Sequence, residues 1–112
     1  MDDKLYILWT TGDVSTAMNM VLMYAKNSLL KGWWQHVTVI VWGASAQVVA
    51  ENEIVQEEIK IAQHVGVEFS ACIACARRLG VIEKLEGMGV EVIPWGEPLT
   101  DLLKDGAHLI TI

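Results

Sequence analysis

The chain has little cysteine, little positive charge and no long apolar segment. Only 2 of its 112 residues are cysteine, too few for the disulfide framework of a small secreted domain, and this fits a reducing cytoplasm. The start, Met-Asp-Asp-Lys, is acidic, unlike a secretory signal. No apolar run approaches the roughly 18 residues that span a bilayer. We therefore expect a cytoplasmic protein without a membrane segment.

Positive charge is scarce. The 8 Lys and Arg residues stand against 14 Asp and Glu residues and give a formal net charge of −6 at pH 7. Proteins that bind nucleic acid normally carry a basic stripe that displaces the counterions of the phosphates. The only adjacent basic pair in this chain is Arg77–Arg78. The composition therefore argues against direct binding of DNA or RNA.

The order of apolar patterns predicts an α/β fold. The length and the 53% hydrophobic content suit one domain over residues 1–112. Short β-rich runs alternate with stretches of helical periodicity, which predicts a three-layer sandwich with a five-stranded, mainly parallel sheet covered by helices on both faces. The expected strands are 5–10, 37–42, 67–71, 90–94 and 108–112, and the expected helices include 14–31, 51–65 and 98–104.

Chemistry in such a sheet gathers beyond the carboxyl ends of the strands. Four segments are expected to meet there: 11–13, 43–45, 72–75 and 95–96. Asp13 is expected to cap the first helix, since its carboxylate can accept hydrogen bonds from the first helical turn. Trp95 is expected to form a wall of the site around the cysteines.

Cys72 and Cys75 are the only thiols, and they lie where the third expected strand ends and a helix begins. Unpaired backbone N–H groups and the helix dipole favour a thiolate at such a position, and a thiolate is nucleophilic. We therefore expect Cys72 and Cys75 to be the catalytic residues. A free cysteine is also commonly a small buried hydrophobe, an interpretation that suits Cys75 better because it lies one turn inside the helix.

Metal and cofactor chemistry find less support. A structural zinc site needs four ligands, but there is no second cysteine pair and the three histidines, His36, His64 and His108, are scattered. Residues 11–13 differ from the phosphate loop of flavodoxins, and Asp13 would repel a phosphate. We therefore expect neither metal nor cofactor. A Cys-x-x-Cys dithiol at a helix start does match the geometry of a thioredoxin-like redox switch.

The run from Gly66 through Cys72 and Cys75 to Gly80 resembles the DsrE/DsrF-like family, which includes TusD-type sulfur-relay proteins and YchN-like proteins. The resemblance implies a small α/β sandwich of flavodoxin-like or DsrE-like type that assembles into trimers or hexamers. It also implies that sulfur is carried as a persulfide on the strand-end cysteine, a position that only Cys72 matches. Cys75 coincides with the second cysteine of YchN-like members.

The leading hypothesis is therefore sulfur transfer by a homo-oligomer, with Cys72 as the persulfide-carrying nucleophile between unidentified donor and acceptor proteins. Two alternatives stay open: a non-catalytic oligomeric binding module and a Cys72–Cys75 dithiol redox switch.

Arg78 could add positive charge near the thiols, although both arginines also suit an ordinary helix surface. Adjacent Trp33 and Trp34 cannot both point inward, so we expect an apolar patch there that another subunit covers.

Overall fold

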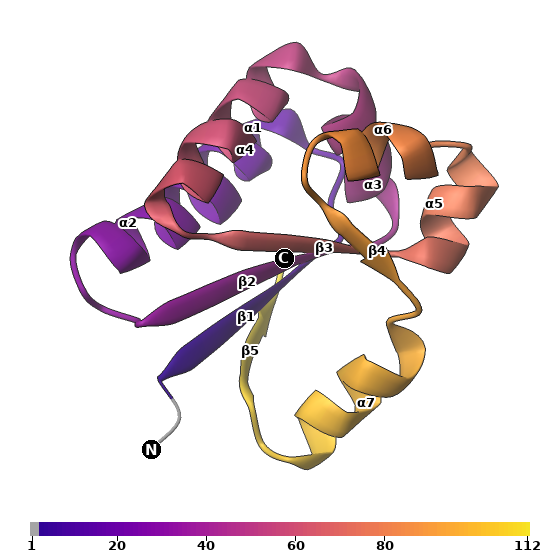
Figure 1. Cartoon of the computed structure of the whole chain (residues 1–112). Coiled ribbons are helices and arrows are strands. Elements are labelled where there is room, and N and C mark those ends of the chain that lie inside the picture. Colours follow the sequence, from indigo (N-terminus) through magenta and orange to yellow (C-terminus); the bar gives the residue numbers. More distant parts are fainter. Residues whose placement is uncertain (1–2) are drawn as a thin grey trace.

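The structure is a computed structural model that describes residues 3–112. Met1 and Asp2, the first residues of the acidic start, lie outside the described residues. Five strands form one sheet in the order β4-β3-β2-β1-β5, and every neighbouring pair is parallel (Figure 1). The predicted α/β fold is thereby confirmed. The strands are β1 (Lys4–Trp9), β2 (His36–Val41), β3 (Glu68–Cys72), β4 (Glu91–Ile93) and β5 (His108–Thr111).

Two of the helices, α3 and α6, are not among those expected from the sequence. The helix expected over 51–65 begins at Glu53 instead, because Asn52 is extended and caps it: the Asn52 side-chain oxygen accepts a hydrogen bond from the Val55 N–H at 2.9 Å. The helical segments are α1 (Val14–Thr16), the π-helical η1 (Ala17–Leu22), α2 (Met23–Leu30), α3 (Ala44–Glu51), α4 (Glu53–Val65), α5 (Ile73–Leu79), α6 (Ile82–Gly87) and α7 (Gly96–Lys104).

The first helix begins where the sequence predicts. The carboxylate of Asp13 accepts hydrogen bonds from the Thr16 hydroxyl at 2.6 Å and from the Thr16 backbone N–H at 2.9 Å. Both bonds favour the charged carboxylate, so they lower the pKa of Asp13 from its usual value. The N-cap prediction for Asp13 is confirmed.

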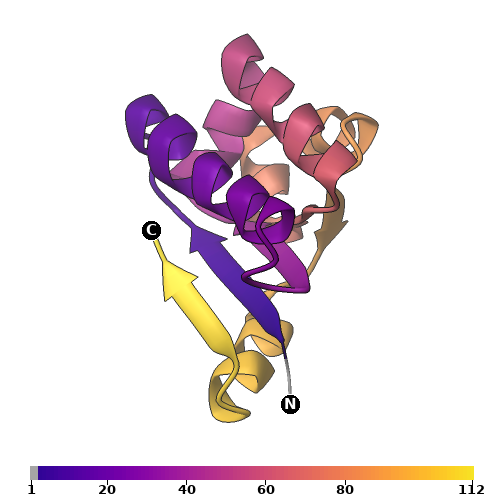
Figure 2. The same cartoon turned by 90° about the vertical axis from the view of Figure 1, so that its left-hand side faces the viewer.

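The helices cover the two faces of the sheet unequally. Helices α1 to α6 lie on one face, whereas α7 lies alone on the other (Figures 1 and 2). The cause is the strand order, since β5 joins the sheet beside β1 rather than beside β4. A flavodoxin sheet has the order 2-1-3-4-5, so here the last strand takes the edge that the second strand occupies there. The chain reaches that edge through α7, which lies below the sheet in Figure 1.

Side chains alternate between these two faces along each strand. In β1, Leu5, Ile7 and Trp9 enter the large core beneath α1 to α6, whereas Tyr6 and Leu8 pack in the smaller cluster near α7. Strand β3 follows the same rule: Phe69 and Ala71 belong to the large core, and Cys72 belongs to the smaller cluster. The alternation therefore assigns Cys72 to the face that α7 covers.

Beyond α2, the adjacent tryptophans diverge as predicted. Trp33 is 53% exposed, while Trp34 packs against the large core and its indole N–H donates to the Tyr24 hydroxyl at 3.3 Å. The ring of Trp34 also lies 5.3 Å from that of His108, centroid to centroid.

Among residues 3–112, none of the helices combines the length and the apolar character that crossing a bilayer requires.

Candidate functional site at the carboxyl ends of the strands

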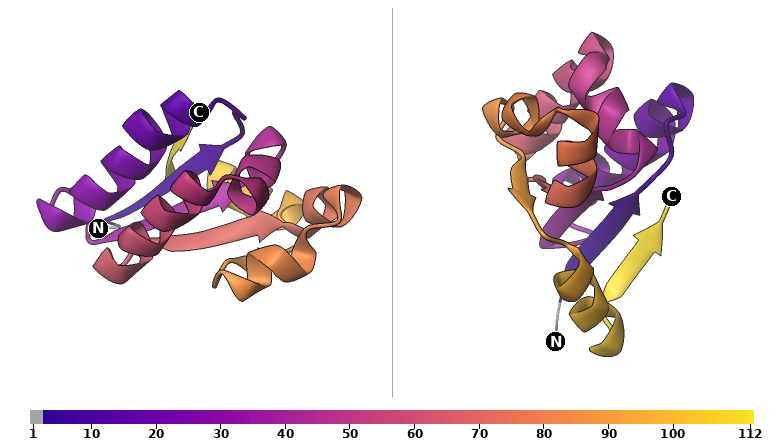
Figure 3. Two further views of the ribbon diagram at one scale, coloured as in Figure 1. Left: turned by 90° about the horizontal axis from the view of Figure 1, so that it is seen from above. Right: turned by 90° about the vertical axis from the view of Figure 1, so that its right-hand side faces the viewer.

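The four segments expected at the carboxyl ends of the strands do meet, because all strands run the same way (Figure 3). Each loop touches the next one along this edge. The contacts join Gly12, whose ideal Cβ would lie 3.2 Å from the Cβ of Ala44, then Gly43 and Cys75 through a hydrogen bond, then Cys72 and Trp95 through apolar packing.

Cys72 is the last residue of β3 and the N-cap of α5. Its backbone is extended (φ −73°, ψ 121°), so its side chain still follows the alternation of the strand. The thiol packs with Ile40 and Trp95, and the residue is only 4% exposed. Its sulfur makes no capping hydrogen bond to α5, so the expected contact between the thiol and the backbone amides of the helix start is not formed. Cys72 is a shielded thiol.

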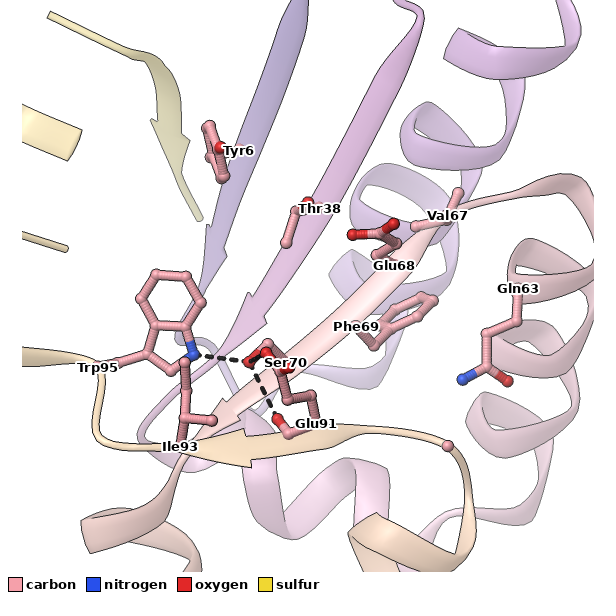
Figure 4. A pocket seen from close by; sticks show the side chains of 11 residues that line it. Tyr6, Thr38, Gln63, Val67, Glu68, Phe69, Ser70, Glu91, Ile93 and Trp95 are labelled. Atoms are coloured by element: carbon pink, nitrogen blue, oxygen red, sulfur yellow. Dashed lines mark hydrogen bonds between the residues drawn. The ribbon is translucent and has the colours of Figure 1, made fainter. Parts of the chain in front are cut away.

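Trp95 covers Cys72, as expected, and is held in place by a buried hydroxyl. The indole N–H donates to the Ser70 hydroxyl oxygen at 2.7 Å, and the Ser70 hydroxyl donates to the Glu91 carbonyl at 3.0 Å (Figure 4). Trp95 itself is 6% exposed. Ser70 is not among the expected site residues, although it is a lone hydroxyl in the apolar end of a strand.

Cys75 has the opposite environment and corrects the expectation that it is the more buried thiol. It is half-buried, and its thiol donates to the Gly43 carbonyl at 3.4 Å. Gly43 has φ +79° and ψ −140°, a conformation that favours glycine, and it ends the turn that brings this carbonyl to α5. A cleft of about 270 Å³ opens beside Cys75. Its lining comprises Trp42, Gly43, Ala44, Gln47, Ala74, Cys75, Arg78 and Leu79.

The adjacent arginines also differ. Arg78 lines the cleft beside Cys75, whereas Arg77 lines a separate hollow with Gly80, Ile82 and Glu83. Residues three apart share a helix face and residues two apart do not, which explains why only Arg78 accompanies Cys75. The residues that line the cysteine cleft therefore include one cysteine, Cys75, and one arginine, Arg78.

A larger hollow of about 740 Å³ extends from the sheet face that α7 leaves open, past the edge of the sheet, to Gln63 of α4 (Figure 4). Tyr6, Thr38 and Glu68 form a row across its floor, in line with their pairing in the sheet. Neither cysteine lines this hollow. Trp95 does, and it also packs on Cys72, so the indole forms part of the wall between the hollow and the thiol.

None of the histidines lies beside the cysteines in the chain's fold: His36 and His108 begin β2 and β5, at the opposite edge of the sheet from Cys72, and His64 belongs to α4. His36, His64 and His108 are exposed, and over residues 3–112 no three His, Cys, Asp or Glu side chains are grouped as metal ligands would be.

Comparisons with known proteins agree with this architecture. The profile of the DsrE/DsrF-like family matches residues 3–112, and the chain belongs to that family. The chain is similar to a conserved protein of unknown function, BT1422, from Bacteroides thetaiotaomicron, whose solved structure has 43% sequence identity, a TM-score of 0.96 and coverage of 98% of this chain and 95% of that one. A search of the curated proteins returned no match.

A more distant likeness concerns the fold alone. The structure of MTH1491, a protein of unknown function from Methanobacterium thermoautotrophicum, has 15% identity to this chain and a TM-score of 0.75. The alignment covers 99% of this chain and 100% of that one.

The bond between Ser70 and Trp95 should contribute measurably to stability. Ser70→Ala leaves a buried indole N–H without an acceptor, so we expect the free energy of unfolding to fall by about 1–3 kcal/mol. Because Trp95→Phe removes the same bond, the double variant should lose less than the sum of the two single losses. Urea unfolding measures all three variants.

The matched control is Thr100→Ala, which removes an exposed hydroxyl that donates to the Gly96 carbonyl. This change should cost no more than about 0.5 kcal/mol. Strictly additive losses for Ser70→Ala and Trp95→Phe would contradict a coupled bond above Cys72.

Proposed function

We propose that this chain is a sulfur-relay protein in which Cys72 is the nucleophile that carries sulfur as a persulfide, a sulfurtransferase activity. The proposal is supported by one observation above all: two free thiols lie three residues apart at the carboxyl ends of the strands, one shielded and the other open to a cleft. Membership of the DsrE/DsrF-like family is consistent with this chemistry.

Shielding suits a thiol that must keep a labile sulfur. Exchange at a persulfide depends on whether a competing thiol can reach it, and oxidation of cysteine follows exposure. At Cys72 the packing of Ile40 and Trp95 restricts both. Cys75 lies within the same apolar environment, since it packs against the cluster that contains Cys72. The proposal therefore places the transfer of sulfur between Cys75, at the cleft, and Cys72, in the apolar cluster.

The relay would take sulfane sulfur from a donor and pass it to an acceptor protein that offers a cysteine. Each transfer exchanges one S–S bond for another, so no oxidant or reductant is consumed. Such exchange needs only a donor, the two thiols and an acceptor. This distinguishes the relay from a dithiol redox switch, which must lose two electrons and two protons to form a Cys72–Cys75 disulfide.

The location of the stored sulfur tests the proposal. Reduced protein is incubated to saturation with a persulfide donor, the donor is removed, and the protein is alkylated and mapped by fragment mass spectrometry. We expect one added sulfur on Cys72, because the shielded position protects it after the donor is gone. Cys72→Ser should lose this lasting adduct.

Ser70→Thr provides a folded control for that measurement, since it keeps a hydroxyl for Trp95 and leaves both thiols in place. It should store sulfur as the parent protein does. An unmodified Cys72 after saturation would refute the relay, and a Cys72–Cys75 disulfide in its place would identify the redox switch.

In this proposal the relay protein assembles as a homo-oligomer, a trimer or a hexamer. The support comes from a row of exposed apolar side chains on one face of η1 and α2, formed by Met20, Met23 and Leu30. Leu30 is 62% exposed, and Trp33 continues the row beyond the helix. Several large apolar side chains exposed along one segment are typical of a surface that packs against another protein.

Sedimentation equilibrium should give a mass of three or six copies of the 12.4 kDa chain. Leu30→Asp places a charge in the row and should shift the mass toward the monomer. Leu103→Asp is the matched control, because Leu103 is equally exposed but belongs to α7 on the opposite face of the sheet. A monomeric parent protein would contradict the assembly.

A further inference from the structure

We propose that the cleft beside Cys75 is the loading site of the relay, where a small anionic persulfide binds Arg78 and delivers its sulfur to Cys75 before Cys72 receives it. This inference rests on the proposed function and adds to it the order of the two thiols and the class of the sulfur donor.

The order of the thiols follows from their access. Cys72 is 4% exposed and is packed in the cluster with Ile40 and Trp95, so an outside sulfur atom has little access to its thiol. Cys75 lines an open cleft. A nucleophile must be reachable by its substrate as well as reactive. The first exchange with a donor therefore takes place at Cys75.

Arg78 gives the cleft a preference for anions. It lies three residues after Cys75 on the same helix face and lines the same cleft. Within residues 3–112 the two ion pairs are Lys26–Glu58 and Lys60–Glu57, so no carboxylate of that part of the chain neutralises Arg78. An unpaired guanidinium beside the thiol is notable in a chain of net charge −6. A carboxylate on the donor would supply the missing partner.

The size and the walls of the cleft limit the donor further. Its volume is about 270 Å³, far more than the roughly 10–15 Å³ that a single water molecule requires on the same measure. Trp42 and Leu79 provide apolar walls, and Gln47 provides an amide. The cleft therefore accommodates a short aliphatic persulfide with one carboxylate.

The transfer balances without any further reactant. The Cys75 thiol gives its proton to solvent and leaves the Gly43 carbonyl, and the thiolate attacks the outer sulfur of the donor R–S–SH. A bond forms between Cys75 Sγ and that sulfur, the donor S–S bond breaks, and R–S⁻ leaves and takes up a proton. The Cys72 thiol then loses its proton as its sulfur attacks the outer sulfur of the Cys75 persulfide. The S–S bond to Cys75 breaks, Cys72 becomes the persulfide, and the released Cys75 sulfur takes up a proton and is a thiol again.

Two short donors of different charge, one anionic and one neutral, test the role of Arg78. Mercaptopropionate persulfide carries a carboxylate, and mercaptoethanol persulfide carries a neutral hydroxyl on a chain of similar length. The initial rate of sulfur loading, followed by intact mass, should be about two- to five-fold higher for the anionic donor, as expected for one exposed ion pair. Raised salt should reduce this preference.

Arg78→Gln should abolish the preference for the anionic donor. Arg77→Gln is the matched control, because it removes the same charge from the neighbouring residue, which lines a different hollow. It should retain the preference. Equal preferences in the two variants, or none in the parent protein, would overturn the role of Arg78.

The order of the thiols is tested by Cys75→Ser, in which the serine hydroxyl can still donate to the Gly43 carbonyl. The initial rate of loading should fall about tenfold or more, because Cys72 then reacts only in locally opened states. Loading of Cys72 at the parent rate in this variant would overturn the inference and leave the relay intact. Failure of Cys72 to hold sulfur at saturation in the parent protein would refute the relay itself.

Discussion

The site depends on the change from strand to helix at Cys72, because this change alters how often side chains return to the same face of the chain. Up to this residue the chain is a strand, in which side chains alternate between the two faces, and after it the chain is a helix with 3.6 residues per turn. Cys72 is the last residue to follow the alternation, so its thiol joins Ser70 on the face covered by α7. Cys75 follows the helix and faces Gly43. One strand-to-helix junction therefore gives two thiols of very different access.

The topology of the sheet decides which thiol is shielded. Because β5 is added beside β1, the connection after β4 must cross the second face of the sheet, and α7 is the helix that makes this crossing. Trp95 immediately precedes α7 and packs on Cys72. The same crossing leaves part of the sheet uncovered, where the hollow shown in Figure 4 lies. A different position for β5 would leave Cys72 without its cover.

The sequence allowed the strands, the Asp13 cap and the position of the cysteine pair to be predicted, because all three follow from local periodicity and turn chemistry. The exposure of the two thiols could not be predicted in this way. It depends on the bond between Ser70 and Trp95, 25 residues apart, and on the strand order that places α7. The short helices α3 and α6 were missed because they carry too few turns for a clear periodicity, and the roles of Arg77 and Arg78 separate only once α5 has a known orientation.

The central claim, that Cys72 is shielded while Cys75 is accessible, is tested most directly by competitive alkylation of the native protein. Reduced protein is treated briefly with a limiting amount of iodoacetamide, unfolded in urea, and treated with an isotopically heavy form of the reagent. Fragment mass spectrometry then assigns each label to a residue. The structure predicts the first label on Cys75 and the heavy label on Cys72. Equal or faster first labelling of Cys72 would contradict the account.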